Sequence, residues 1–263
     1  MSVSILFDAA KCTACRGCQV ACKQWNDLPG EATKNTGSYQ NPPRLSADTW
    51  LLMQFREVEN GDGGITWAFR RYACMHCHDP ACVSACPVGA LYKTDEGPVL
   101  YRADRCIGCR YCMLACPFDV PTFTWDKGLI EGAVIRKCNF CQDRISNGLE
   151  PACVKTCPTG ALRFGERDEM IALAEDRIRE RPDRYVDHVY GKEETGGTSL
   201  LYVSHVPFEE LGLPSLGSEP VQENTKHIME IATPAVLGGL LVVLGSLSWI
   251  IRRRQRMMGK GRG

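Results

Sequence analysis

Cysteine spacing is the feature that constrains this chain most, because all 16 cysteines fall in short-spaced runs. Two consecutive runs read Cys74-x2-Cys77-x4-Cys82-x3-Cys86-Pro87 and Cys106-x2-Cys109-x2-Cys112-x3-Cys116-Pro117. The second run has the bacterial ferredoxin spacing, in which three thiolates on one tight loop reach three iron corners of a [4Fe–4S] cubane. The fourth thiolate starts the next element and ligates a neighbouring cluster. The stretch Cys74–Cys116 alone therefore predicts a two-cluster ferredoxin.

Two further groups flank this stretch. They read Cys12-x2-Cys15-x2-Cys18-x3-Cys22 and Cys138-x2-Cys141-x11-Cys153-x3-Cys157-Pro158. The first has Lys23 where the other groups have Pro, and the second has an unusually long gap, but neither change removes a ligand. Gly-Ala recurs at the same distance after Pro87 and Pro158, which marks an internal repeat. Four groups of four cysteines leave no thiolate over and predict four [4Fe–4S] clusters, so iron is expected on all sixteen.

Disulfides and zinc are the two alternative uses of so many cysteines. Disulfide scaffolds are usually shorter and denser in Cys than this chain. Zinc sites use CxxC pairs in twos, whereas three of the four groups here end in Cys-x3-Cys-Pro. Iron–sulfur chemistry is therefore favoured, and a membrane-anchored zinc-binding interaction protein is the alternative from a different class. Iron and zinc analysis of anaerobically purified protein separates the two.

Charge is unevenly distributed, although the formal net charge is zero. The last twelve residues hold six Lys or Arg and no acid, which leaves 25 basic and 31 acidic residues elsewhere. This distribution gives no support to nucleic-acid binding. Met1–Lys11 is too short and too polar for a secretory signal and has no Arg-Arg pair, while Val3–Phe7 is expected to form a first strand.

Residues 23–73 form an insertion without Cys. Trp50–Phe55 and Ile65–Phe69 are rich in aromatic and branched side chains, and Asn60–Gly64 between them supplies the positive φ angles of a turn. We therefore expect a β-hairpin that covers or spaces the clusters. Its Trp and Phe residues are expected to pack in the core and not to relay electrons.

After the cluster groups, Glu166–Arg181 has apolar residues at helical spacing and ends before Pro182. This pattern predicts an amphipathic surface helix packed on the ferredoxin body. The segment from 182 to 226 reads as irregular, with a single strand expected within Leu200–Val206. The alternative for the helix over Glu166–Arg181 is docking to a partner, which is the less common use of such a surface.

Ile231–Ile251 contains 21 residues without a charge, enough to cross a hydrocarbon core of about 30 Å. It is followed by Arg252–Arg256, so the positive-inside rule puts the C-terminal tail in the cytoplasm and the cluster domain on the periplasmic or outer side. Small residues on one side of this helix favour a partner helix in the membrane, although Gly is common in membrane helices. These residues are Ala235, Gly238, Gly239, Gly245 and Ser246.

From about Cys12 to the membrane helix, the chain resembles the iron–sulfur (beta) subunits of membrane-bound respiratory formate dehydrogenases. The most specific stretches are Cys15–Cys22, Cys74–Cys82 and Glu150–Gly160, with support from Gly196–Thr198 and the single anchor. Four-cluster subunits of other molybdenum enzymes and hydrogenases share the Cys pattern and generally match less well outside it.

The resemblance implies which groups exchange their fourth ligand, which spacing alone leaves open. It implies two inner clusters, held by Cys74, Cys77, Cys82 and Cys116 and by Cys106, Cys109, Cys112 and Cys86. It implies two outer clusters, held by Cys12, Cys15, Cys18 and Cys157 and by Cys138, Cys141, Cys153 and Cys22. The implied fold is α+β, with two pseudo-symmetric bacterial-ferredoxin-like 2[4Fe–4S] modules, a hairpin insertion and one C-terminal transmembrane helix.

We therefore expect a four-cluster ferredoxin domain over residues 1–165, including the insertion 23–73. A surface helix and irregular linker over 166–226 would lead to a single-pass membrane anchor over 227–252. The basic cytoplasmic tail would occupy 253–263, with lipid around the anchor.

The implied function is an electron wire without a substrate site of its own. A catalytic subunit with molybdenum or tungsten bound to pterin would oxidise formate, and a membrane cytochrome b would pass the electrons to quinone. The sequence shows no Ser/His/Asp set, phosphate loop or flavin fingerprint. The alternative is the same wire serving a hydrogenase or a sulfur-compound or nitrate reductase, because the substrate is selected elsewhere. Without a signal of its own, the subunit would be exported with a twin-arginine partner.

Three histidines lie near expected functional regions. His76 and His78 stand between cluster ligands, and we expect them to be structural or to tune cluster potentials, because each group already has four Cys. His227 precedes the membrane helix, where placement at the interface without a role is expected. Contact with a haem edge or quinone in a partner is the alternative for His227.

Overall fold

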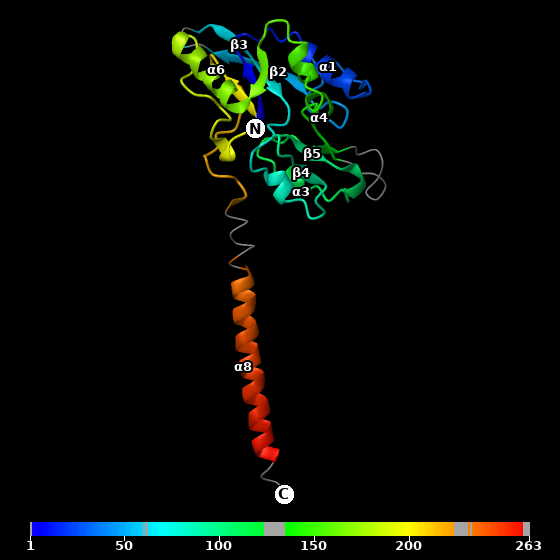
Figure 1. Ribbon diagram of the computed structural model, residues 1–263, viewed down its shortest axis with the longest axis vertical. Helices are drawn as coiled ribbons and strands as arrows, with labels where there is room; N and C mark the ends of the chain where they lie inside the picture. The colour runs from blue at the N-terminus through cyan, green and yellow to red at the C-terminus, as the bar shows by residue number, and fades with distance from the viewer. Residues whose placement is uncertain are drawn as a thin grey trace. The chain divides into compact units, whose positions relative to one another are not determined.

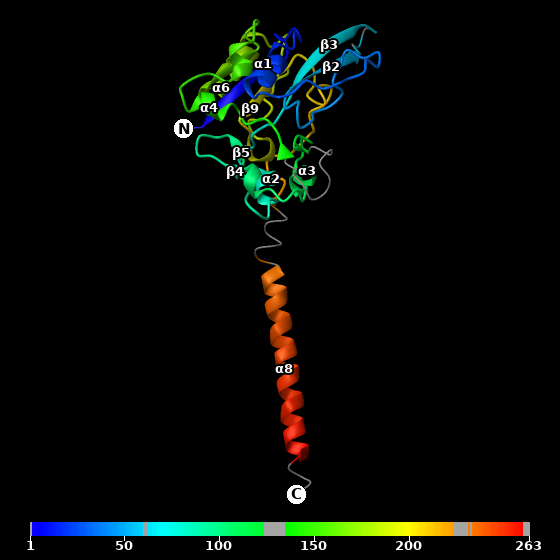
Figure 2. The same cartoon turned by 90° about the vertical axis from the view of Figure 1, so that its right-hand side faces the viewer.

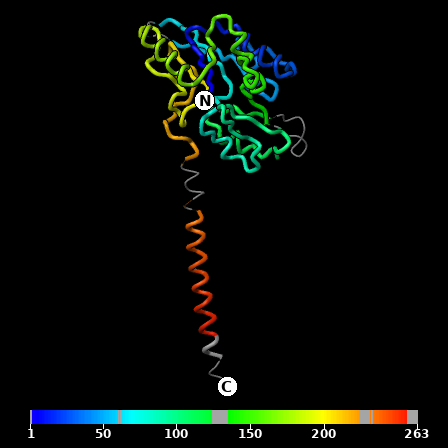
Figure 3. Tube along the Cα trace, in the orientation of Figure 1, coloured from blue at the N-terminus to red at the C-terminus, as the bar shows by residue number. Residues whose placement is uncertain are grey.

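The computed structural model describes residues 2–59, 61, 63–123, 135–223, 231 and 233–259. The chain divides into two units, Met1–Pro220 and Val221–Gly263, which we call the head and the C-terminal unit. Figure 3 traces the chain from its blue N-terminus in the head to its red end. His227 lies outside the described residues.

Three strands that are far apart in the sequence form the central sheet of the head. β1 (Val3–Asp8) lies in the middle, antiparallel to β8 (Leu162–Glu166) and parallel to β9 (Leu200–Val203). The apolar and branched residues of β1 and β9 suit strands buried on both faces, whereas β8, at one edge, is buried only in part. Because β9 completes this sheet, the segment after β8 belongs to the compact head.

The two faces of the sheet are covered differently, because alternate side chains of a strand point to opposite faces. Leu6 lies against α6 (Arg167–Glu180), as the apolar periodicity of that segment predicts. Ile5 and Phe7 point into the largest group of buried side chains, on the other face. The buried residues of α6 recur every four positions, at Met170, Ala174 and Ile178.

Short helices carry the cysteine groups and pack in two pairs. α1 (Gly17–Trp25) of the first group packs against α5 (Ala152–Lys155) of the fourth group. α2 (Ala81–Ser84) of the second group packs against α3 (Tyr111–Ala115) of the third. α4 (Gln142–Ile145) follows Cys141. Figure 2 shows α2 and α3 gathered below α1 and α4.

Two small antiparallel strand pairs complete this part of the head, and Figure 1 shows the first of them beside α3. β4 (Leu91–Lys93) pairs with β5 (Val99–Tyr101), and β6 (Thr122–Phe123) pairs with β7 (Ile135–Arg136). The segment between β6 and β7 is not among the described residues. Two short 3-10 turns, η1 and η2, occupy Ala103–Arg105 and Glu194–Gly196.

The insertion before the second cysteine group contains an antiparallel pair of long strands. β2 (Leu52–Glu59) pairs with β3 (Ile65–Tyr72) over eight residues, in register from Leu52 opposite Tyr72 to Glu59 opposite Ile65. Of the turn residues expected between them, Asn60 and Asp62 lie outside the described residues. Leu52, Met53 and Gln54 at the start of β2 are buried, whereas most side chains near the turn are exposed and Val58 is buried.

The aromatic residues of this insertion do not all pack in the core. Trp50 is buried, as expected, but Trp67 is 38% exposed, so the expectation of core packing is wrong for Trp67. Trp67 instead joins a surface cluster in which the rings of Tyr39 and Trp67 have centroids 5.1 Å apart. Phe55 belongs to the same cluster and lies under the guanidinium of Arg16, 4.8 Å from its ring centroid.

The C-terminal unit contains one long helix, α8 (Thr233–Gly259). Its stretch Thr233–Gln255 has a mean hydropathy of 2.1 over its most apolar part, and its side chains are exposed, Leu241 by 72%. At 1.5 Å per residue this stretch is about 35 Å long, which exceeds a hydrocarbon core of about 30 Å. α8 is therefore long and apolar enough to span a membrane. Ser246 donates its hydroxyl to the Val242 carbonyl at 2.7 Å, so its hydroxyl proton is used within the helix.

A buried carboxylate fastens α6 and the loop after it to the end of β1. The Asp8 side chain is fully buried and accepts hydrogen bonds from the amides of Ala10 at 3.0 Å and Lys11 at 3.1 Å. Arg177 Nη1 and the Tyr185 hydroxyl each donate to Oδ2 at 2.9 Å. Four donors therefore compensate one buried charge, which is the condition under which such a charge is tolerated.

Removing Arg177 tests how much its ion pair with Asp8 contributes to stability. Arg177→Ala leaves Asp8 buried without its cation, so we expect a loss of about 3 kcal/mol, measured as a lower thermal midpoint of cluster-loaded protein. Arg179→Ala on the same helix is the matched control, because the Arg179–Asp176 pair is exposed and should contribute less than about 1 kcal/mol. Equal midpoints for the two variants would contradict the role given to Arg177.

Candidate iron–sulfur centres

The sixteen thiols gather in four sets, two of which surround cavities. One cavity is lined by three thiols of the third group and one of the second, which are Cys106, Cys109, Cys112 and Cys86. Another is lined by three thiols of the fourth group and one of the first, which are Cys138, Cys141, Cys153 and Cys22. In both, the fourth thiol comes from the group whose helix packs alongside.

Electrostatic contacts between thiols identify the other two sets. Burial chiefly raises the pKa of Cys12 to about 11, with Cys157 and Cys15 adding to the effect. Burial chiefly raises the pKa of Cys77 to about 12, with Cys74 and Cys116 adding to it. Burial also chiefly raises the pKa of Cys82, with the same neighbours Cys74, Cys116 and Cys77 adding to the effect. Burial likewise raises the pKa of Cys18 most, with Cys12 and Cys15 adding to it as well as Cys153 of another set. These sets are Cys12, Cys15, Cys18 and Cys157, and Cys74, Cys77, Cys82 and Cys116.

Left-handed backbone residues shape the ligand loops. In the first and third groups, Ala14 and Gly108 have φ of 51° and 68°, and Arg16 and Arg110 have φ of 62° and 66°. Such residues turn successive amides toward one point, a geometry that favours anions. The two groups thus repeat one loop conformation.

Backbone amides of these loops point at the sulfurs. The Ala14 amide donates to Cys12 Sγ at 3.4 Å, and the Gly108 amide donates to Cys106 Sγ at 3.4 Å. The Phe140 amide donates to Cys138 Sγ at 3.4 Å and the Ala90 amide to Cys86 Sγ at 3.2 Å. Hydrogen bonds of this kind favour the thiolate form and tune cluster potentials.

Replacement of the loop-ending proline changes one helix. In the third group, α3 ends at Ala115, before Cys116 and Pro117, because the residue before Pro is disfavoured in a helix. In the first group Lys23 stands at that position, and α1 continues through Cys22 to Trp25. The substitution therefore lengthens the helix and leaves Cys22 in the thiol set with Cys138.

The segment Gly196–Thr198 covers one thiol set. Thr198 forms an isolated bridge with Cys77, and the Gly197 carbonyl accepts from the His78 amide at 2.9 Å. Gly197 has φ of 91°, and an added Cβ would lie 3.0 Å from the Arg167 guanidinium. The positive φ therefore favours glycine here, and a larger residue would also press on the Arg167 guanidinium.

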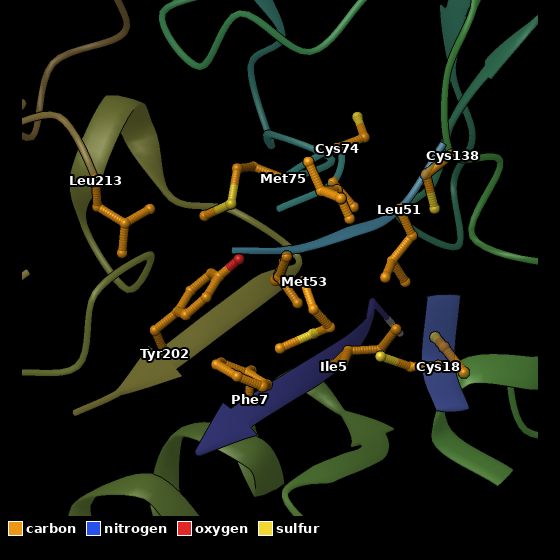
Figure 4. Close-up of a cluster of buried hydrophobic side chains, with 14 of the residues drawn as sticks. Ile5, Phe7, Cys18, Leu51, Met53, Cys74, Met75, Cys138, Tyr202 and Leu213 are labelled. Carbon is orange, nitrogen blue, oxygen red and sulfur yellow. The ribbon is translucent and has the colours of Figure 1, made fainter. Parts of the chain in front are cut away.

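The donor set fits [4Fe–4S] clusters. Four thiols around a cavity offer one ligand to each iron of a cubane, and among the described residues no three His, Cys, Asp or Glu converge closely enough for a single ion. The thiols also belong to the core: Figure 4 shows Cys18 near Ile5, Cys138 near Leu51 and Cys74 near Met75. Buried thiols are weak acids, so binding to iron is what makes them thiolates.

Comparison with known proteins agrees with this geometry. Two models of a 4Fe-4S dicluster domain match, one over residues 11–90 and one over residues 65–167. The iron–sulfur subunit of the nitrate-inducible formate dehydrogenase of Escherichia coli K12 is 44% identical over 206 residues, which are 77% of this chain and 68% of that protein. This chain belongs to the family of formate dehydrogenase iron–sulfur subunits.

Two other relatives carry different names. Formate dehydrogenase 2 subunit beta (cytochrome c-553) of Nitratidesulfovibrio vulgaris is 40% identical over 214 residues, which are 76% of this chain and 94% of that protein. Hydrogenase-2 operon protein HybA of Escherichia coli O157:H7 is 32% identical over 290 residues, covering 97% of this chain and 85% of that protein. The resemblance read from the sequence is confirmed, and the chain is an electron-transfer subunit that binds [4Fe–4S] clusters.

Three cations beside the thiols of this iron–sulfur subunit were missed by the sequence analysis. Arg71 Nη2 lies 3.5 Å from Cys153 Sγ, and Lys93 Nζ donates to the Cys77 carbonyl at 2.7 Å. Lys137 Nζ donates to the Cys138 carbonyl at 3.1 Å. Lys137 directly precedes Cys138, and that proximity is the signal by which it could have been found, whereas the sequence marks neither Arg71 nor Lys93 in this way.

His76 occupies the boundary between two thiol sets. Its ring is fully buried, accepts from the Val99 amide at Nδ1 at 3.0 Å, and meets the Phe140 ring edge-on with centroids 4.6 Å apart. Burial lowers the pKa of His76 well below its ordinary value, so the ring is neutral with its proton on Nε2. Nε2 is buried and meets no hydrogen-bond partner among the described residues. Burial likewise lowers the pKa of His78, to about 4.

Exchanging residues between the repeated loops tests their left-handed conformation. Ala14→Gly should keep or raise the thermal midpoint, and Gly108→Ala should lower it, because a Cβ in this conformation costs about 1 to 2 kcal/mol. Gly217→Ala is the control, since Gly217 lacks a positive φ and has open space around it. The midpoints and iron contents of anaerobically purified variants give the measurement. A loss with Ala14→Gly as large as with Gly108→Ala would contradict the loop assignment.

Proposed function

We propose that this subunit holds four [4Fe–4S] clusters and relays electrons from a catalytic subunit with a molybdenum– or tungsten–pterin centre that oxidises formate. The electrons would leave to a membrane cytochrome b that reduces quinone. The observation that carries the proposal is the assembly of sixteen thiols into four sets, each with one thiol from the group that packs alongside. No substrate chemistry is assigned to this subunit itself.

The proposed ligands follow the four thiol sets. Cluster one is held by Cys12, Cys15, Cys18 and Cys157, and cluster two by Cys138, Cys141, Cys153 and Cys22. Cluster three is held by Cys74, Cys77, Cys82 and Cys116, and cluster four by Cys106, Cys109, Cys112 and Cys86. Clusters one and two make one ferredoxin-like module, and clusters three and four make the other.

Contacts between the sets support a line in the order one, two, three, four. Cys18 of the first set feels the charge of Cys153 in the second set. The contact of His76 with Phe140 joins a loop of set three to a loop of set two. Sets three and four share α2 and α3, which pack together. Electrons would therefore cross between the modules beside His76 and Phe140.

The exposed thiols support the same line. Of the sixteen cysteines, all of which lie among the described residues, two are exposed: Cys15 in set one and Cys109 in set four. Exposure at the two ends of the line is what electron entry from one partner and exit to another requires. The thiols of sets two and three are buried or half-buried, so water is kept from the middle.

We propose that α8 anchors the subunit in the cell membrane as its single span. The basic residues Arg252–Arg256, at the C-terminal end of this helix, would place residues 253–263 in the cytoplasm and the head on the periplasmic or outer side. The small residues of α8 would let a helix of the cytochrome subunit approach closely. Protease added to cells without their outer layer should cleave the head; protection there, with cleavage in inverted vesicles, would reverse the orientation.

Paired cysteine replacements test the exchange of ligands between groups. Cys86→Ala should remove about four irons, and adding Cys109→Ala should remove no more, because both residues ligate cluster four. Cys86→Ala combined with Cys77→Ala should remove about eight irons, since two clusters are then lost. Iron analysis of anaerobically purified protein, about sixteen irons for the unmodified chain, gives the count. The reverse pattern would show that each group keeps its own fourth ligand.

Purification of the native membrane complex tests the partners. We expect a pterin-containing subunit and a cytochrome b to accompany the chain, and the complex to reduce quinone with formate as donor. The similarity to Hydrogenase-2 operon protein HybA favours one second candidate, the same wire attached to a hydrogenase. Reduction by hydrogen but not by formate, with a hydrogenase subunit in the complex, would establish that alternative.

A further inference from the structure

Arg71 is a fully charged side chain in the interior of the head. It lies on β3 opposite Met53 and is 1% exposed. The Tyr202 hydroxyl donates to the Arg71 carbonyl at 2.5 Å, which ties this position to the central sheet. The Met53 amide donates to Gln19 Oε1 at 3.1 Å, which ties the facing strand to α1. The backbone around Arg71 is thus fixed on both sides.

The guanidinium faces sulfur and not carboxylate. Its Nη2 lies 3.5 Å from Cys153 Sγ, and its charge also acts on Cys138 and Cys22 of the same thiol set. The described residues provide no Asp or Glu within ion-pair distance of Arg71. Its next strongest sulfur neighbour is Cys18, in the adjoining set.

An arginine buried in this way needs a compensating negative charge, because an unpaired buried ion costs several kcal/mol. The neighbouring thiols supply that charge when they are thiolates on iron. A cluster held by four thiolates is anionic, and it becomes more anionic when it accepts an electron. A fixed cation therefore stabilises the reduced state more than the oxidised state, and the effect is strong where water is excluded.

We propose that the positive charge of Arg71 raises the reduction potential of the cluster held by Cys22, Cys138, Cys141 and Cys153. It raises the potential of the cluster held by Cys12, Cys15, Cys18 and Cys157 by a smaller amount. The inference rests on the ligand sets of the proposed function, and it is independent of which catalytic subunit supplies the electrons. The hairpin insertion thus carries a charge to the junction of two clusters.

The neighbouring Arg70 provides a matched control. It is 5% exposed, close to the value for Arg71, but successive residues of a strand point to opposite faces. Its guanidinium donates to the Gly212 carbonyl and lies 4.6 Å from the ring centroid of Tyr72. Arg70 and Arg71 thus share residue type, burial and strand but differ in their contact with sulfur.

A redox titration followed by electron paramagnetic resonance, on the anaerobically purified full-length subunit in its native complex, tests the proposal. In Arg71→Gln the reduction potential of one cluster should fall by at least 59 mV, which is a tenfold change in its one-electron equilibrium constant. The potential of a second cluster should fall by less. The equilibrium constants of the other two clusters should stay within threefold of their native values. Arg70→Gln should leave all four within threefold.

Arg71→Lys keeps the positive charge on a shorter side chain, so the same signal should shift in the same direction but by less. If Arg71→Gln does not retain its full iron content, the redox titration is made on Arg71→Lys. Unchanged potentials in every iron-replete Arg71 variant, or an equal shift in Arg70→Gln, would overturn the proposal. Failure of the ligand sets would appear separately, in the iron counts of the paired cysteine variants.

Discussion

The structure depends on one electrostatic constraint, the gathering of sixteen cysteine thiols, all but Cys15 and Cys109 buried or half-buried, in a head of about two hundred residues. Burial raises the pKa of Cys18, Cys77 and Cys141 to about 12, so these thiols are protonated at neutral pH when free. Iron must therefore displace their protons, and cluster binding becomes part of folding. Since Cys18 and several other cysteines lie within the hydrophobic core, loss of the clusters would also disturb the packing of the core.

The protein compensates the resulting negative charge at short range. Backbone amides in left-handed loops point at the sulfurs, and Arg71, Lys93 and Lys137 approach thiols or the carbonyls of ligand residues. These three cations come from β3, β4 and the residue before Cys138, which are segments outside the ligand loops themselves. The insertion and the small hairpins therefore serve the clusters electrostatically as well as by covering them.

The family was recognised from the residues around the cysteines, whereas cysteine spacing was sufficient to predict the groups and the kind of cofactor, because ligand geometry restricts the allowed spacings. It could not show which groups exchange a ligand, since that depends on the packing of α1 on α5 and of α2 on α3. Nor could it predict Arg71, because Arg70-Arg71 at the end of an apolar strand resembles an ordinary polar strand end. Whether a strand residue faces solvent or sulfur is decided by register and by partners distant in the chain. The exposure of Trp67 was missed for the same reason.

The distribution of exposure along the line of thiol sets gives the two ends and the middle different tasks. A partner's redox centre must come close to a cluster, so the sets at the ends gain from exposed thiols such as Cys15 and Cys109. In the proposed line the middle sets adjoin other sets, and water beside them would screen the fixed charges that set their potentials. Burial of Arg71 beside Cys153 is effective because water is excluded there. An exposed cation at either end would be screened by water and would have little influence on the potential of a cluster. A fixed charge therefore tunes a cluster potential best in the interior, where Arg71 lies.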